Sequence, residues 1–188
     1  MKSVASNRRV EHAFTIIELL VVLAIILGLA GLILATSSYV QAKGKRTRAE
    51  TEIAALSAAL ESYKADNGVY PTDNVTNALD ARTMVNPTAS QYTGASLFLY
   101  RELSGDPMRN RVPIGKSYFL FKPNMLLPKD QTQAVTAIAD PFGHSYGYST
   151  ANQANPAKGY NPTFDLWSTA GAGPPSEPSP QARWIKNW

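Results

Sequence analysis

An uninterrupted apolar run near the start of the chain constrains the fold more than any other feature of the sequence. Residues 14–35, FTIIELLVVLAIILGLAGLILA, contain one ionisable side chain, Glu18. At a helical rise of about 1.5 Å per residue this run reaches about 33 Å, enough to cross a hydrocarbon core of about 30 Å. We therefore expect a membrane-spanning helix. A carboxylate is costly in that setting, so Glu18 predicts a charged partner.

A short polar leader, MKSVASNRRVEHA, precedes the apolar run. A secretory signal peptide has a similar basic start, but its apolar stretch is about 7–15 residues long and ends in a small-residue cleavage site. The run found here is longer. Basic residues flank it on both sides, so the positive-inside rule does not set its orientation.

The helical pattern continues beyond the apolar run as an amphipathic helix. Apolar residues recur at steps of three and four, while charged residues take the other faces. No proline occurs before Pro71, and the DNG stretch at residues 66–68 supplies a glycine stop. We predict one helix from Phe14 to about Asp66, whose second half buries one apolar stripe. The stripe consists of Ile53, Leu56, Leu60 and Tyr63.

The rest of the chain predicts a small mixed domain packed against that stripe, and hence an α+β fold. Helical spacing at residues 95–103 predicts a second helix. Three short aromatic-rich stretches bounded by Pro, Gly or Asn predict strands of a small antiparallel sheet. These stretches are residues 116–123, 144–150 and 163–169.

Composition and motifs exclude several classes of function. The chain has no cysteine, and its net charge of +4 is spread out, which argues against a disulfide framework, a zinc cluster and nucleic-acid binding. Residues 143–147, GHSYG, fit the pattern of a hydrolase nucleophile elbow, but no histidine follows Ser145. We expect a hairpin turn there, with His144 as a turn residue. We predict neither enzymatic activity nor a cofactor.

Several segments together resemble type IV pilin-like proteins, and most of all the major pseudopilins of type II secretion systems. They are AFTIIELLVVLAIIL with its leader, YKADNGVYPT, ADPFGHSYGY, FDLWSTAG and the terminal WIKNW. The resemblance implies that a prepilin peptidase cuts between Ala13 and Phe14, and that the new amino group is methylated. It further implies that Glu18 pairs with this amine on an adjacent subunit during assembly. The residues alone leave open an intrachain pair with Phe14, or a carboxylate lying at the membrane interface.

The resemblance also implies an organisation and a set of partners. Residues 1–13 would be the leader, 14–38 the transmembrane and assembly half of the long helix, and 39–188 a periplasmic pilin-like domain. The chain would form a helical homo-oligomeric filament, a pseudopilus, with an inner-membrane assembly platform and minor pseudopilins as partners. Two alternatives stay open: a type IV pilin for adhesion, motility or DNA uptake, and a membrane-anchored interaction protein that never polymerises.

The C-terminal loop departs from the pattern of major pseudopilins, which commonly hold calcium there. Ala172 and Trp184 stand where the resemblance leads us to expect acidic residues, and Glu177 is the one carboxylate left in the loop. Calcium takes several oxygen ligands. We therefore predict no calcium site.

Overall fold

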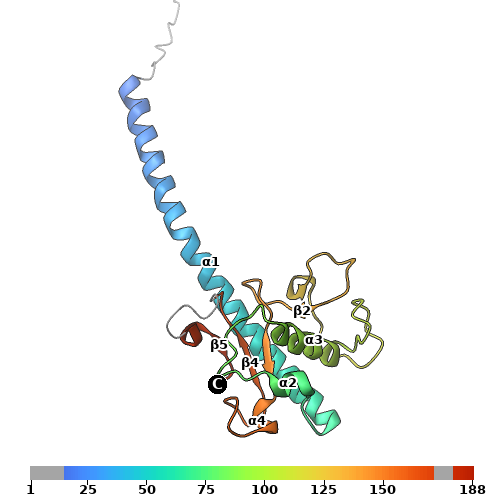
Figure 1. Ribbon diagram of the computed structural model, residues 1–188. Coiled ribbons are helices and arrows are strands. Elements are labelled where there is room, and N and C mark those ends of the chain that lie inside the picture. Colours follow the sequence, from blue (N-terminus) through green and yellow to red (C-terminus); the bar gives the residue numbers. More distant parts are fainter. Residues whose placement is uncertain (1–14, 172–179) are drawn as a thin grey trace, which may run out of the picture. The chain divides into compact units, whose positions relative to one another are not determined.

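Helix α1 is the longest element of the structure. The computed structural model describes residues 15–171 and 180–188, with the backbone alone at residues 33–38 and 180. Helix α1 runs without a break over Ile16–Asn67, as Figure 1 shows. It ends at Gly68, whose φ of +79° is a left-handed conformation that glycine adopts without strain. The predicted helix from residue 14 to about 66 is therefore confirmed, with ends at Ile16 and Asn67.

The contacts within the chain divide it into two units, residues 1–42 and residues 43–188. In the described part of the first unit, every large apolar side chain from Ile16 to Leu32 is at least half exposed. Across the described residues, none of the helices combines the length and the apolarity that crossing a membrane requires. The membrane span expected over residues 14–38 stays a prediction.

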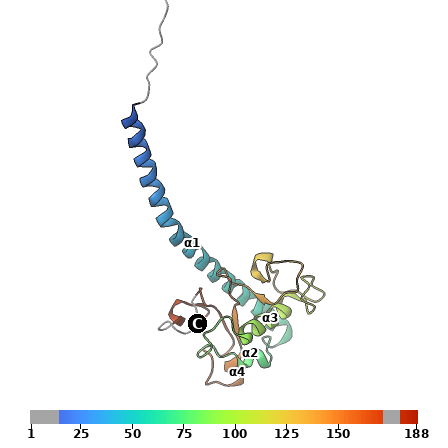
Figure 2. The same ribbon diagram turned by 45° about the horizontal axis from the view of Figure 1, so that its top comes forward.

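The second unit encloses the apolar stripe of α1. Leu56 and Leu60 are fully buried and Ile53 nearly so, while Tyr63 is half-buried. They pack in one cluster with α3 (Ser90–Ser104), and the hydroxyl of Tyr63 donates to Oε2 of Glu102 on α3 at 2.9 Å. Both views place α3 beside this part of α1 (Figures 1 and 2). The predicted stripe and the second helix are confirmed, although α3 begins five residues earlier than expected.

Short antiparallel strands complete the core, which confirms the α+β class. Strands β1 (Leu126–Leu127) and β2 (Ala137–Ile138) form one pair. Strands β3 (Gly147–Ser149), β4 (Asp165–Ser168) and β5 (Ile185–Lys186) form a second sheet in that order. Two of the three predicted strands, at residues 144–150 and 163–169, correspond to β3 and β4.

Two further short helices and two 3₁₀ turns connect these elements. Helix α2 (Asn74–Ala78) begins with a capping box, in which Asp73 and Thr76 exchange side-chain to backbone hydrogen bonds. Its Thr76 hydroxyl also bonds Thr150, which precedes α4 (Ala151–Ala154). The 3₁₀ turns are η1 (Pro123–Met125) and η2 (Pro180–Arg183).

The strand predicted at residues 116–123 is wrong, because these residues form no ladder. The backbone N–H groups of Tyr118 and Phe119 both donate to the carbonyl of Leu103, at the end of α3. Their rings, together with Phe121, pack against aromatic residues of the core. The aromatic residues that suggested a strand instead serve side-chain packing.

We expect residues 43–188 to fold as an independent unit, because their core lies entirely within them. In that fragment Leu56→Ala should lower the free energy of unfolding by about 2–5 kcal/mol, since it leaves a cavity at a fully buried site. The matched control Leu120→Ala, at a side chain that is 85% exposed, should change it by less than about 0.5 kcal/mol. Urea unfolding measures both. A fragment that unfolds without a cooperative transition would contradict the expectation.

Candidate functional site

Glu18, the acid in the apolar run, closes the first turn of α1. Its Oε2 accepts hydrogen bonds from the backbone N–H of Thr15 at 2.9 Å and from the Thr15 hydroxyl at 2.8 Å. The N–H of Glu18 donates in turn to Thr15 Oγ1 at 3.3 Å. This reciprocal arrangement is a capping box, which satisfies donors that a helix N-terminus leaves free. Glu18 therefore has a local structural role that its position in an apolar run did not reveal.

Thr15 is the residue of this site that the sequence reasoning missed. The spacing Thr-x-x-Glu at the start of an apolar run is the signature of a capping box and was present in the sequence. The other two predicted site residues, Ala13 and Phe14, lie outside the described residues. Cleavage between them, and a contact of the Phe14 amine with Glu18, stay predictions.

The carboxylate of Glu18 retains one oxygen for another partner. Both bonds from Thr15 end on Oε2, and Oε1 has no hydrogen-bond or ion-pair partner among the residues that the structure describes. A carboxylate can accept at both oxygens. Capping the helix and binding an amine are therefore compatible roles for this side chain.

The segment ADPFGHSYGY is organised by a buried carboxylate. Oδ1 of Asp140 accepts hydrogen bonds from the N–H groups of Phe142 and His144, both at 2.9 Å. The hydroxyl of Ser168 on β4 donates to Oδ2 at 2.5 Å. Burial raises the pKa of Asp140, and these donors oppose that rise. Asp140 thus holds the turn and joins it to the second sheet.

The GHSYG stretch forms a hairpin, as predicted. The N–H of Asp140 donates to the carbonyl of His144, and Tyr146 N–H donates to the carbonyl of Ile138. Ser145 is buried and leads into strand β3, whereas a nucleophile elbow leads into a helix. The second glycine of the motif, Gly147, lies directly under the ring of Trp167, where a Cβ would clash at 2.2 Å.

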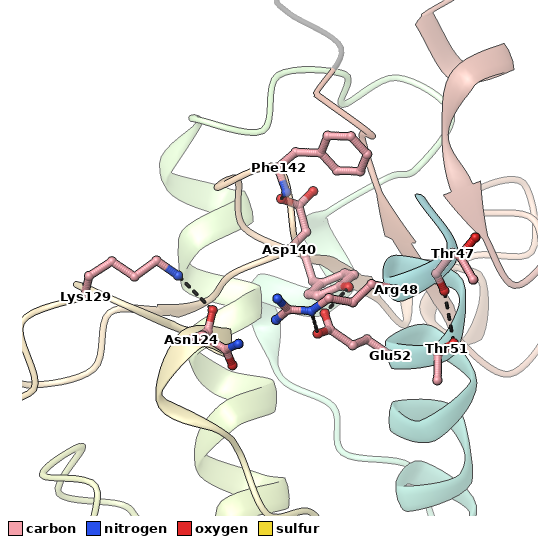
Figure 3. Close-up of polar contacts among 9 residues, drawn as sticks. Thr47, Arg48, Thr51, Glu52, Asn124, Lys129, Asp140 and Phe142 are labelled. Carbon is pink, nitrogen blue, oxygen red and sulfur yellow. Dashed lines mark hydrogen bonds and ion pairs between the residues drawn. The ribbon is translucent and has the colours of Figure 1, made fainter. Parts of the chain in front are cut away.

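A groove of about 350 Å³ lies on the second unit, between α1 and residues 119–125. Arg48 and Glu52 line it from α1, and their side chains form an ion pair at 2.7 Å (Figure 3). The hydroxyl of the buried Tyr146 donates to the other oxygen of Glu52 at 2.8 Å. Burial and the nearby charge of Glu52 raise the pKa of Tyr146, so its proton stays in this bond. The groove therefore has a fixed polar wall.

No pattern in the sequence singled out this groove. The i,i+4 spacing of Arg48 and Glu52 indicates a helix-surface ion pair, which is common and points to no site. The opposite wall comes from the segment that was expected to be a strand. No local pattern could have placed residues 119–125 against α1.

The C-terminal residues are held by aromatic stacking. Trp184 is buried and stacks on Trp167, with ring centroids 5.7 Å apart and the planes 10° from parallel. Trp188 meets the edge of Trp167, and Tyr160 stacks on Trp188. The Oδ1 of Asn187 accepts from the N–H of Leu166 on β4, and its Nδ2 donates to the carbonyl of Phe164, which precedes β4. Trp184, which stands where the resemblance led us to expect an acidic residue, thus belongs to an apolar cluster.

These contacts do not favour a metal at the C-terminal end. Among the described residues, no group of three or more His, Cys, Asp or Glu side chains could hold a metal ion. Most of the loop, residues 172–179 with Ala172 and Glu177, lies outside the described residues. The absence of a calcium site therefore stays a prediction.

The sequence of the chain is similar to one family of known proteins. A family profile described as type II secretion system protein G matches residues 38–118. A core protein G of the type II secretion system from Escherichia coli K12 is 33% identical over 102 residues, which cover 53% of this chain and 68% of that protein. No solved structure matches this chain.

Two further relatives carry the same name. The core protein G of Pectobacterium carotovorum is 32% identical over 114 residues, covering 60% of this chain and 68% of that protein. The core protein G of Pseudomonas aeruginosa is 34% identical over 105 residues, covering 55% of this chain and 72% of that protein.

We expect Trp184, and not calcium, to stabilise the C-terminal residues. Trp184→Ala should lower the free energy of unfolding by about 3–5 kcal/mol, because it removes a buried ring that stacks on Trp167. Trp184→Phe, the matched control, should lower it less. Thermal unfolding of the unmodified protein should give the same Tm with added calcium and with a chelator, since a bound ion would raise it. A rise of Tm on adding calcium would contradict the prediction.

Proposed function

The chain belongs to the type II secretion system protein G family, and we infer from this membership that it is a structural subunit of a pseudopilus in type II protein secretion. One structural observation supports this function above the others. The single helix α1 has an exposed apolar first part, Ile16–Leu32, and a second part whose stripe is buried in a folded unit. Such a helix can be anchored by one half while the other half carries a domain into the periplasm.

We further propose the following organisation along the chain. Residues 1–13 are a leader, 14–38 serve as a single membrane span before assembly and as packing surface afterwards, and 39–188 are a periplasmic pilin-like domain. The basic leader and the apolar run meet at Ala13 and Phe14, which supports cleavage there by a prepilin peptidase and methylation of the new amine. The partners would be further copies of the chain, the assembly platform of the inner membrane and minor pseudopilins. We propose no enzymatic activity and no role in binding nucleic acid.

Processing can be tested at the cleavage point. Replacing the small Ala13 by Trp should leave uncut precursor in the membrane, because the peptidase site accepts a small residue before the cut. Mass spectrometry of the purified chain should find a methylated Phe14 as the first residue of the unmodified protein. The control variant Val4→Trp places the same bulky residue in the leader away from the cut, and it should mature normally. A normal Phe14 end in the Ala13→Trp protein would contradict the assignment.

We propose that Glu18 acts in assembly by neutralising the amine of Phe14 on a neighbouring subunit. Oε1 of Glu18, which has no partner among the described residues, supports this role, and so does the place of Glu18 at the start of the apolar run. A charge at the edge of an apolar environment needs a partner of opposite charge. The capping hydrogen bonds from Thr15 offer a different explanation for why Glu18 is present. Substitutions at Glu18 can separate the capping role from the charge-pair role.

Two substitutions at Glu18 distinguish the charge from the cap. Glu18→Gln keeps a carbonyl oxygen that can accept from Thr15 but has no charge, whereas Glu18→Ala removes both. If the amine is neutralised by Glu18, both variants should accumulate as cleaved protein in the membrane and form no filaments. Filament yield after shearing and secretion of an exported protein measure the effect. Normal assembly of Glu18→Gln would show that the cap suffices and that the charge pair is not needed.

The same experiments separate the proposed function from its alternatives. A membrane-anchored protein that never polymerises would retain its leader or form no filaments at all. A type IV pilin would assemble, but deleting its gene would leave protein secretion intact. Loss of secretion together with loss of filaments supports the pseudopilus.

A further inference from the structure

The groove between α1 and residues 119–125 contains two cationic groups, Arg48, which is in an ion pair with Glu52, and Lys122, which forms no ion pair with any described residue. Arg48 uses its Nε in the ion pair with Glu52, and its terminal amino groups have no hydrogen-bond partner among the described residues. Figure 3 shows the guanidinium extending from α1 toward the segment that carries Asn124. The ammonium of Lys122 on the opposite wall likewise has no partner within the described part of the chain.

An exposed apolar side chain, Leu120, lies beside these cations, and we call it the Leu120 ridge. Leu120 is 85% exposed, more than any other large apolar side chain described in residues 43–188. It lines the groove and also a second hollow of about 70 Å³, where Arg111 and Phe121 contribute to the wall. One amino group of Arg111 is buried there without a hydrogen-bond partner. An exposed apolar side chain beside a hollow with a polar wall fits a docking surface, in which apolar contacts are surrounded by polar groups.

This combination of groups selects a ligand chemistry. The terminal amino groups of Arg48 and the ammonium of Lys122 are donors that suit a carboxylate. Leu120 and the partly buried Phe119 next to it offer contacts for an apolar side chain. The groove therefore suits a protein segment in which a carboxylate lies close to apolar groups.

The chain itself carries carboxylates that complement the groove. Glu61 and Asp130 are exposed and form no ion pair with any described residue. Glu50 and Asp66, the other exposed carboxylates described in residues 43–188, pair with Arg46 and Lys116 of their own chain. A filament of identical subunits requires contacts between two different patches of one protein. The ammonium of Lys122 and the terminal amino groups of Arg48 supply donors on one patch, and Glu61 and Asp130 supply acids without an ion pair to any described residue on others.

We propose that this groove, with the Leu120 ridge, receives Glu61 or Asp130 of a second copy of the chain as a head-to-tail contact of the filament. The proposal rests on the proposed function, since it requires that the chain polymerises. It assigns to Arg48 and Lys122 the recognition of a neighbouring subunit. It also gives Leu120 a burial site that the single chain does not provide.

The absence of cysteine from the chain allows a direct test of burial at the ridge. Leu120→Cys introduces a single thiol, and Ala154→Cys, at an exposed position on α4, is the matched control. In filaments, maleimide should label Cys at position 120 about tenfold more slowly than in the detergent-solubilised mature subunit, whereas position 154 should change less than about twofold, because an interface core excludes solvent. Equal labelling of filament and subunit at position 120, or equal protection of both positions, would overturn the proposal. If the unmodified chain forms no filaments, the proposed function itself has failed.

A charge exchange identifies the occupant. Lys122→Glu should reduce filament yield by repulsion without altering the urea unfolding curve, because the Lys122 side chain has no partner in the described chain. A second substitution, Glu61→Lys or Asp130→Lys, should restore the filament yield if it reverses the charge of the acid that contacts position 122. Restoration by either one supports the second copy as occupant. If neither charge reversal restores the filament yield while position 120 is still protected, another protein of the filament occupies the groove and the proposal is overturned.

Discussion

Burial of one stripe of α1 is the interaction on which the folded unit depends. Leu56 and Leu60 are fully enclosed, and the rest of the unit is arranged around them. The same helix exposes its apolar residues throughout Ile16–Leu32. A helix that is apolar on all sides needs an apolar environment, whereas one with a single stripe needs only one packed face. The change along α1 from apolar residues on all sides to a single apolar stripe thus determines which part can belong to a folded domain.

Buried carboxylates compensate for the shortness of the sheets. With strands of two to four residues, ladders hold little of the chain, and loops need other partners for their N–H groups. Asp106 accepts from the N–H of Arg111, Asp140 from two N–H groups of its turn, and Asp165 from Tyr160 and Asn161. Burial raises the pKa of Asp140 and of Asp165, which shows that this arrangement carries a desolvation cost. Hydrogen bonds from the loop N–H groups offset part of that cost.

The fold could be predicted where the determining pattern is local. Periodicity indicated α1 and α3, aromatic-rich stretches between turn residues indicated two strands, and the glycine at position 68 indicated where α1 ends. The aromatic-rich stretch at residues 116–123 was predicted wrongly as a strand because aromatic side chains pack equally well without a ladder, and where they pack is a property of the tertiary core. Strand β5 was missed because it is placed by Trp184 and Asn187 through contacts with β4, which is distant in sequence. The groove was missed for the same reason.

Glu18 shows why a local and a functional explanation of one residue need not compete. Its Oε2 closes the first turn of α1 through Thr15, and this bond fixes where the carboxylate lies. An acid already held in place loses little side-chain freedom when it meets a charged amine. The free Oε1 can then bind at a smaller entropic cost than a mobile side chain would incur. In the proposed contact, the capping box would hold the carboxylate in place, and the N-terminus of α1 would be part of the assembly site.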